Sequence, residues 1–193
     1  AGNMGLSHRF DDILNVAEQL RIREDIAFVF IGGGSRHKEV LAQIKSRQLT
    51  NVSMLPFQNI DLWAQSFGVG DLHLVVLREE CTGLIVPSKA YGIMSAGRPM
   101  IYQGNAEGEI ARMIAEEGIG IVVPMSDIEG LKQGILKYAS QPEMGKIQGQ
   151  KARQLAEGRY SRSRAIQRYA ALLIDRYADH QIEAGNGMDD ESQ

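Results

Sequence analysis

The chain has 193 residues, a formal net charge of -3 and a single cysteine. This length fits one domain with a sizeable core, and the small net charge without a long basic run disfavours a nucleic-acid partner. One cysteine excludes a disulfide framework and a cysteine-based zinc site, and agrees with a reducing compartment. No apolar run approaches the ~18 residues of a membrane span. The chain opens on AGNMGLSHRF, and we interpret it as a fragment of a longer protein.

Short apolar strands alternate with amphipathic helical patterns along the chain. Helices are predicted at 8–20, 36–47, 60–67, 87–95, 107–117, 128–138, 143–157 and 161–179. Strands are predicted in DIAFVFI, NVSMLPF, DLHLVVL, PMIYQG and GIGIVVP. Because strands that are apolar on both faces need cover on both sides, the pattern predicts an α/β fold with a doubly wound parallel sheet and helices on both faces.

The domain is expected to cover residues 1–180, ending in the helix at 161–179. That helix repeats apolar residues, so it should pack on the domain or on a missing neighbour. These residues are Ile166, Tyr169, Leu172, Leu173 and Ile174. The remaining 181–193 are small, polar and acidic, and we expect them to form a disordered tail.

A doubly wound sheet binds its ligand at the carboxyl ends of the strands, where the strand order reverses. If a strand precedes Ala1, the order 3-2-1-4-5-6 places it beside the strand at 71–77. The loops GNMGLS and REECTGLIVPSK would then open side by side. We therefore expect the functional site between these two loops.

The sequence Pro87-Ser88-Lys89 begins the predicted helix at 87–95. Proline in a first helical turn is ordinary helix-start chemistry, because it has no amide hydrogen to leave unpaired. The same exposed amides and positive helix end can also hold phosphate, with Lys89 adding a cation. The position at the expected switch point favours the phosphate interpretation.

Two glycine clusters follow strand positions. In GGGS, residues 32–35, the dinucleotide pattern G-x-G-x-x-G fails because its third glycine falls on His37, so a tight strand-to-helix turn is favoured. In GNMG, Gly2 and Gly5 permit close backbone approach and Asn3 offers a donor, although turn formation alone would explain them.

Other residues with reactive side chains have ordinary explanations. Glu79 and Glu80 are typical of a solvated loop face, and His8, at a predicted helix start, is expected on the surface. His73 alternates with apolar neighbours and is interpreted as a satisfied core histidine. Cys81 has no visible base partner, so an inert thiol is preferred to a nucleophile. No pair of histidines or carboxylates has convincing metal-ligand spacing.

Several segments together resemble one family. They are GNMGLSHRFDDIL, FVFIGGG, NVSMLPF, VPSKAYGIMSAGRPMI and EGEIARMIAEEGIGIVVP, and the match runs from Gly2 to about Tyr177. The chain resembles the C-terminal, donor-binding half of a GT-B glycosyltransferase, most closely the family-four group that builds bacterial O-antigen and capsular polysaccharides. The resemblance implies a Rossmann-like domain and a retaining transfer from a nucleotide diphosphate sugar, commonly a UDP-sugar, to a polysaccharide or lipid-linked acceptor. It implies no metal or other cofactor.

The resemblance also assigns site residues. The turn after NVSMLPF would read the base through backbone groups, at Phe57 and Gln58. The residues implied for the diphosphate are Gly2, Asn3, Gly5, His8, Arg9, Ser88 and Lys89. Those implied for the donor sugar form the loop Glu80, Cys81, Thr82, Gly83 and Leu84.

Two departures from the family pattern affect this assignment. Asn3 and His8 stand where the family typically has Arg and Lys, and the glutamate that commonly holds the ribose falls on Gly92. Lys89 and Arg9 are available to restore the charge at the diphosphate. Nothing obvious replaces the ribose carboxylate, although Glu80 could reach the ribose if its loop folds inward.

Acceptor recognition would belong to a preceding N-terminal domain, so this chain alone is expected to bind donor without transferring sugar. We expect a cytoplasmic location, with attachment to the inner membrane surface through the missing half. Two alternatives stay open. One is a non-catalytic or degenerate nucleotide-binding or interaction domain. The other is an NAD-dependent oxidoreductase half, which the missing glycine fingerprint disfavours.

Overall fold

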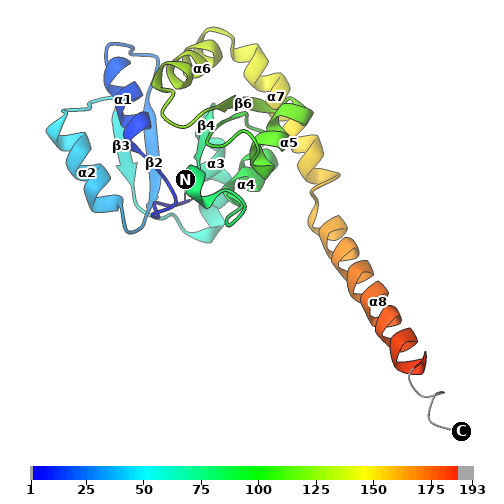
Figure 1. Cartoon of the computed structure of the whole chain (residues 1–193). Helices are drawn as coiled ribbons and strands as arrows, with labels where there is room; N and C mark the ends of the chain where they lie inside the picture. The colour runs from blue at the N-terminus through cyan, green and yellow to red at the C-terminus, as the bar shows by residue number, and fades with distance from the viewer. Residues whose placement is uncertain (1, 187–193) are drawn as a thin grey trace, which may run out of the picture. The chain divides into compact units, whose positions relative to one another are not determined.

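The computed structural model describes the backbone of residues 2–186 and the side chains of residues 2–174 except Ile60 (Figure 1). Contacts divide the chain into two units, one up to Gln154 and one from Leu155 onward. The first unit holds all the strands of the described part and the candidate site.

The first unit alternates strands and helices, as the sequence pattern predicts. Its strands are β1 (Gly2–Asn3), β2 (Phe28–Gly33), β3 (Val52–Leu55), β4 (His73–Val76), β5 (Met100–Gln103) and β6 (Gly120–Val123). Its helices are α1 (Asp11–Gln19), α2 (His37–Ser46), α3 (Trp63–Gly68), α4 (Lys89–Ser95), α5 (Glu109–Glu117), α6 (Ile128–Ser140) and most of α7 (Pro142–Glu157). Two short 3-10 helices, η1 (Ile60–Leu62) and η2 (Glu79–Cys81), precede α3 and α4. The five predicted strands and the predicted helices of this unit are confirmed, with small shifts at their ends.

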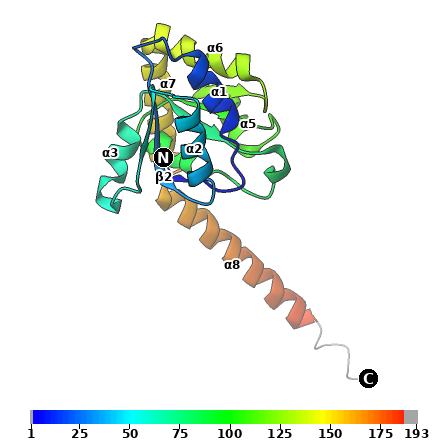
Figure 2. The same cartoon turned by 90° about the vertical axis from the view of Figure 1, so that its left-hand side faces the viewer.

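The strands form two parallel three-stranded sheets with the orders β1-β2-β3 and β4-β5-β6, flanked by helices (Figures 1 and 2). This arrangement confirms the Rossmann-like α/β fold class. The expected continuous order 3-2-1-4-5-6 is only partly realised, because among the described strands none pairs with both β2 and β4. Gly2 and Asn3, predicted to lie in a loop after an upstream strand, themselves pair with Gly32 and Gly33 as β1.

The two sheets are joined by a shared core and a few hydrogen bonds. α1 packs against α6, and buried Leu14 and Val16 of α1 belong to one apolar cluster with Val76 of β4 and Ile101 of β5. The amide of Arg78 also donates to the carbonyl of Ser7 at 2.9 Å, tying the loop after β1 to the end of β4. The carboxyl ends of β1 and β4 therefore lie together.

The glycine cluster after β2 is explained by close packing of β1. Gly32 and Gly34 have positive φ angles of 129° and 136°. A Cβ atom at Gly32 would overlap the carbonyl oxygen of Gly2 on the neighbouring strand. Only glycine allows this approach at such a φ, so the strand-to-helix turn interpretation of GGGS is supported.

The second unit consists largely of α8 (Arg162–Asn186). The apolar residues predicted to pack along this helix are each more than half exposed, from Ile166 to Ile174. Residues 181–186 of the predicted tail continue the helix, and 187–193 lie outside the described residues. The division between a domain at 1–180 and a disordered tail stays a prediction. None of the helices in the described part has the length and apolar character needed to cross a membrane.

Candidate functional site

The loop between β1 and α1 carries His8 into the interior. Its side chain is only 8% exposed, and Nδ1 lies 2.7 Å from the carbonyl oxygen of Val76. The prediction of a surface position is wrong, because α1 begins at Asp11 and the residues before it cross the end of β4. Since a carbonyl only accepts, Nδ1 carries the proton and Nε2 of the neutral ring is unprotonated.

Lys89 is the first residue of α4 and lies close to His8. Burial lowers the pKa of Lys89 to about 8. The pKa of His8 is lowered by burial and by the nearby positive charge of Lys89, against the opposing effect of the Val76 hydrogen bond. At neutral pH the pair is therefore a protonated amine beside a neutral imidazole.

His8 and Lys89 line one cavity of about 810 Å³ together with Gly2 and Asn3. The amides of Ser88 and Lys89 lie ahead of the first internal bond of α4, which Ala90 donates to the Pro87 carbonyl at 3.0 Å. The Ser88 side chain is exposed and makes no cap hydrogen bond. The structure thus brings together four of the residues predicted at the diphosphate, with the helix-start amides of Ser88 and Lys89 next to the cation.

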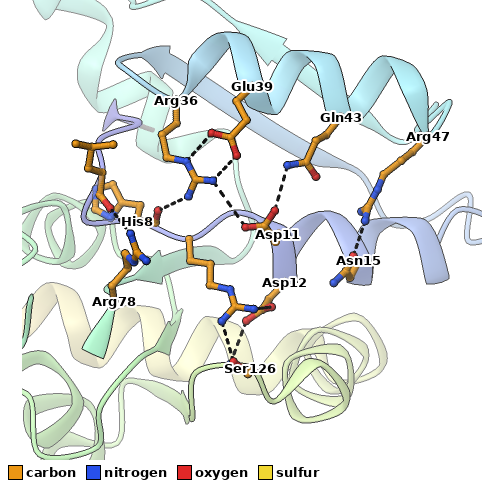
Figure 3. Close-up of polar contacts among 12 residues, drawn as sticks. His8, Asp11, Asp12, Asn15, Arg36, Glu39, Gln43, Arg47, Arg78 and Ser126 are labelled. Atoms are coloured by element: carbon orange, nitrogen blue, oxygen red, sulfur yellow. Dashed lines mark hydrogen bonds and ion pairs between the residues drawn. The ribbon is translucent and has the colours of Figure 1, made fainter. Parts of the chain in front are cut away.

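Arg9 is directed elsewhere. Its Nη1 donates to Oγ of Ser126 at 2.9 Å, and its Nη2 lies 3.5 Å from a carboxylate oxygen of the fully buried Asp12 (Figure 3). The charge predicted to reach a diphosphate is paired with Asp12 in this arrangement. Gly5 lies in the same loop, with Nδ2 of Asn3 at 3.4 Å from the position a Cβ would take.

Two arginines that the sequence reasoning missed hold the loop after β1. The guanidinium of Arg36 donates to the carbonyl of His8 at 3.0 Å. Arg78 follows β4, and its guanidinium lies 3.4 Å from the carbonyl of Leu6 (Figure 3). Arg78 also forms an ion pair with Glu80 at 3.8 Å. Arg78 stands directly after a predicted strand at the expected switch point, which is a signal that could have found it. Arg36 has no comparable signal.

The loop predicted for the donor sugar begins within η2 and runs toward α4. Glu80 and Leu84 are exposed, Leu84 to 81%, and Gly83 has a positive φ of 80°. Thr82 and Gly83 line a second cavity of about 200 Å³ with Tyr102 of β5. Within the described residues, the buried Oγ1 of Thr82 and hydroxyl of Tyr102 have no hydrogen-bond partner. The loop therefore borders a small cavity with unmatched hydroxyl groups.

The residues predicted at the base follow β3. The ring of Phe57 is 60% exposed and would lie 3.1 Å from a Cβ at Gly33, so it covers the end of β2. Nε2 of Gln58 donates to the carbonyl of Pro56 at 2.9 Å, which shapes the turn. Because parallel strands end on the same edge, this turn lies beside the glycine loops after β1 and β2.

Gly92, where the family pattern has its ribose glutamate, faces an aromatic ring. A Cβ at this position would lie 3.0 Å from two ring atoms of Phe67 on α3. A larger side chain would have to displace that ring. The space beside α4 is therefore occupied by Phe67, which explains why this chain has glycine there.

The remaining candidates have structural explanations. Nε2 of His73 lies 2.7 Å from the Phe67 carbonyl, and burial lowers the pKa of His73 to about 4, so the prediction of a satisfied core histidine is confirmed. Cys81 is a half-buried free thiol. Across the described residues, no group of three or more histidine, cysteine, aspartate or glutamate side chains is placed to hold a metal ion.

The fold and the cationic loop edge define a doubly wound α/β protein with a candidate anion site at the carboxyl ends of its strands. Residues 1–155 match the family described as Glycosyl transferases group 1, and the chain belongs to this family. The resemblance to glycosyltransferases is thereby confirmed.

Two curated relatives carry related names. The chain is 31% identical over 174 residues to the probable glycosyltransferase WbjE of Pseudomonas aeruginosa, covering 89% of this chain and 42% of that protein. It is 26% identical over 172 residues to the putative colanic acid biosynthesis glycosyl transferase WcaI of Escherichia coli (strain K12), covering 88% and 40%. The chain thus spans about two fifths of the length of these relatives.

Solved structures share the fold. A variant of S. aureus TarM, solved with fondaparinux, alpha-GlcNAc-glycerol and UDP, has a TM-score of 0.73 at 20% identity, covering 89% of this chain and 34% of that one. Anabaena Alr3699/HepE, solved with UDP-glucose, has a TM-score of 0.70 at 18% identity, covering 88% and 46%.

Proposed function

We propose that this chain is the donor-binding, C-terminal half of a retaining GT-B glycosyltransferase. The full enzyme would move a sugar from a nucleotide diphosphate sugar, most naturally a UDP-sugar, to a polysaccharide or lipid-linked acceptor. Family membership and the names of the two relatives support the reaction class. Neighbours solved with UDP or UDP-glucose support the donor class.

The observation that carries the proposal is the half-buried Lys89 beside the neutral His8 at the edge of the glycine loop. When the bond between the anomeric carbon and the diphosphate breaks, negative charge grows on the phosphate oxygens. The ammonium group of Lys89 and the helix-start amides of Ser88 and Lys89 stabilise that charge. Transfer without a metal or other cofactor is part of the proposal.

The other predicted site residues assign a place to each part of the donor. The diphosphate lies between the loop after β1 and the start of α4, and the base lies toward Phe57 and Gln58. The sugar lies toward the loop from Glu80 to Leu84, whose Gly83 leaves open space at its Cα. Arg78, through its position next to the loop after β1, is a second source of positive charge.

Partners and location follow from the same proposal. Acceptor binding belongs to a preceding N-terminal domain, so this chain by itself binds donor and transfers nothing. The full enzyme works in the cytoplasm, at the inner membrane surface when its acceptor is lipid-linked.

Calorimetric titration and thermal unfolding with UDP, GDP and NAD test the proposal. At a UDP concentration about 100 times the Kd, folding is stabilised by roughly 2.7 kcal/mol, while NAD has no effect. Stabilisation by GDP in place of UDP would correct the base. Stabilisation by NAD alone would support the oxidoreductase alternative, and no response to any nucleotide would support a non-catalytic interaction domain.

A further inference from the structure

The cavity of about 200 Å³ next to the predicted donor sugar loop is bordered by Thr82 and Gly83 of that loop, by Tyr102 of β5 and by the first residues of α5. Its volume is below the roughly 300–1,000 Å³ of pockets that enclose a whole small ligand, and several times the roughly 30 Å³ that one water molecule occupies in the liquid. The cavity therefore has room for one substituent of a larger ligand. We call this space the α5 cavity.

Two hydroxyl groups of the α5 cavity are buried and lack a hydrogen-bond partner within the described part of the chain. They are the phenol of Tyr102 and Oγ1 of Thr82. Tyr102 is fully buried, and this burial raises the pKa of Tyr102, so its hydroxyl keeps its proton. A Cβ at Gly108 would lie 3.2 Å from the Tyr102 oxygen and 3.9 Å from Cγ2 of Thr82. Because buried hydroxyls are normally paired, these two indicate a ligand group that hydrogen-bonds beside Gly108.

The start of α5 adds backbone donors at the same place. Gly108 is the N-cap and provides no side-chain cap, and the first internal bond of α5 runs from the amide of Arg112 to the carbonyl of Gly108 at 3.0 Å. The amides of Glu109 and Ile110 precede that bond, so they have no partner within the helix. Gly108 and Ile110 are buried and line the cavity. These amides and the Tyr102 hydroxyl together favour an acceptor oxygen as the missing partner.

The charges that line the α5 cavity favour an uncharged group. Glu107 and Glu109 each carry a carboxylate, while Arg112 carries a guanidinium and the helix start adds a partial positive charge. All three side chains are exposed, and Glu109 accepts a hydrogen bond from the hydroxyl of Tyr91 at 3.2 Å. A carboxylate or phosphate would therefore meet two like charges against one guanidinium. An amide carbonyl accepts the same hydrogen bonds without this repulsion.

The rest of the lining is apolar. It consists of Leu77, Ile85, Val86, Pro87 and Ile110. A group that matches the whole cavity must therefore combine an acceptor oxygen, a donor for a hydroxyl and an apolar end. An acetamido group has these three parts, as its carbonyl, its N–H and its methyl.

The α5 cavity also begins next to the candidate diphosphate site. Pro87 lines the cavity, and the next two residues, Ser88 and Lys89, are those proposed at the diphosphate. In a nucleotide diphosphate sugar the diphosphate is attached at carbon 1, so the substituent on carbon 2 lies close to it. Gly83 borders the cavity, and a Cβ there would have no atom within 4 Å, so a sugar substituent can approach past this residue.

We propose that the α5 cavity receives the acetamido group on carbon 2 of the donor sugar, so that the donor is a nucleotide diphosphate 2-acetamido sugar. This assignment rests on the proposed function, since it names the sugar that the donor site takes. The acetamido carbonyl accepts from the hydroxyl of Tyr102 and from the amides at the start of α5. Its N–H donates to Oγ1 of Thr82, and its methyl packs against Leu77 and Ile110.

Calorimetric titration of the chain of 193 residues tests this proposal. The ligands are UDP, UDP-N-acetylglucosamine and UDP-N-acetylgalactosamine, with UDP-glucose and UDP-galactose as the counterparts that carry a hydroxyl on carbon 2. The better of the two acetamido donors should bind at least about tenfold more tightly than its hydroxyl counterpart, because it pairs groups that otherwise stay unpaired. We call this ratio of affinities the acetamido preference.

Tyr102→Phe should reduce the acetamido preference by about fivefold, because it removes one donor to the carbonyl. The substitution deletes a hydroxyl without a partner among the described residues and keeps the buried ring, so the fold should tolerate it. Tyr91→Phe is the matched control. Its hydroxyl bonds to Glu109, and Tyr91 does not line the α5 cavity, so the acetamido preference should stay the same.

Thr82→Leu tests the space in the cavity by filling it with an apolar side chain. It should lower the affinity for the acetamido donor more than the affinity for its hydroxyl counterpart. A donor with a ¹³C-labelled acetyl methyl then locates the group directly, through nuclear Overhauser effects to the methyl groups of Ile110 and Leu77. Effects to other residues alone would place the acetamido group elsewhere and overturn the proposal.

The titrations separate a failure of this proposal from a failure of the proposed function. If UDP binds and the acetamido and hydroxyl donors bind equally, the α5 cavity holds only water and the acetamido proposal is wrong, while the proposed function stands. An acetamido preference that is unchanged in both Tyr102→Phe and Thr82→Leu also overturns it. If neither UDP nor any of the UDP-sugars binds, the proposed function fails, and the acetamido proposal fails with it.

Discussion

At the scale of single residues, the candidate site depends on where its positive charge comes from. Arg9, one of two residues expected to restore charge, is paired with the buried Asp12 and Ser126. Lys89 lines the cavity, and burial lowers its pKa to about 8. In the proposed function its charge is the main attraction for the diphosphate, and a rise in pH can remove this charge.

Replacing Lys89 with alanine should weaken UDP binding by roughly 1–2 kcal/mol, because a charge-assisted hydrogen bond to phosphate is lost. Calorimetric titration measures the change, and the exposed Lys38→Ala on α2 is the matched control, with an expected change near zero. If Lys89→Ala and the unmodified chain bind UDP with equal affinity, Lys89 is only an ordinary residue of a helix start and does not bind phosphate.

The affinity for UDP should also fall as the pH rises above about 8, because the free chain loses the Lys89 proton there. The lowered pKa of Lys89 has the opposite effect on the stability of the folded chain. The unfolded chain keeps this proton up to its ordinary pKa near 10.5, so it binds more protons above pH 8 and the free chain becomes more stable as pH rises. Lys89→Arg stays charged and should bind UDP with no such fall. An identical pH profile for both chains would show that another group is responsible.

At the scale of elements, the packing of α3 on α4 explains a departure from the family pattern. Phe67 fills the space where a longer side chain at position 92 would extend. The same segment of α3 supplies the Phe67 carbonyl to His73 at the start of β4. A substitution of Gly92 or of Phe67 should therefore disturb the packing of α3, α4 and β4.

Gly92→Glu should destabilise the chain by about 1–3 kcal/mol, since it overpacks the contact with Phe67. In a Phe67→Ala background the cost should be smaller by about 1 kcal/mol, because the obstructing ring is gone. Urea unfolding of the four chains gives the coupling free energy. A coupling free energy of zero would mean that the glutamate side chain at position 92 does not contact the ring of Phe67.

The buried His73 makes stability depend on acid. Its pKa is about 4 in the folded chain and 6.5 as a model value, so the unfolded state binds more protons between these pH values. The free energy of unfolding should fall as pH drops from 6.5 toward 4, by at most about 3 kcal/mol. Urea unfolding should show a flatter profile for His73→Gln, and an unchanged profile would assign the effect to other groups, such as His8.

At the scale of the whole first unit, Asp12 connects the two sheets. From α1, one of its carboxylate oxygens accepts from Nε2 of Gln103 on β5 at 3.0 Å and from the amide of Ser126 at 3.1 Å. Arg9 is its ionic partner at 3.5 Å. Together with the hydrogen bonds that join Ser7 and His8 to the end of β4, these bonds connect α1 and the loop before it to the second sheet.

Asp12→Ala should cost about 3 kcal/mol, because it leaves buried polar partners unpaired. The neighbouring Asp11→Ala is a matched control. Asp11 is half-buried and lies 3.8 Å from Arg36, so its loss should cost less than about 1 kcal/mol. Chemical denaturation compares the two, and equal costs would contradict the linking role of Asp12.

Local pattern was enough to predict most elements. The apolar runs of the strands and the 3.6-residue period of the helices predict the bounds of β2 to β6 and of the helices in the first unit to within a few residues. They do so because both patterns depend only on neighbouring residues. The Pro-Ser-Lys start of α4, the strand-end loops and the family follow from the same short-range signals. The sequence by itself therefore determined the fold class and the edge of the sheet where the candidate site is proposed.

Only the tertiary structure decided which side chains face that edge. It buries His8 under β4, pairs Arg9 with Asp12, and brings Arg36 and Arg78 to the loop after β1. Each of these contacts joins residues distant in the chain. Their energies depend on burial and on partners brought close by folding, and neither quantity is encoded in the spacing of neighbouring residues.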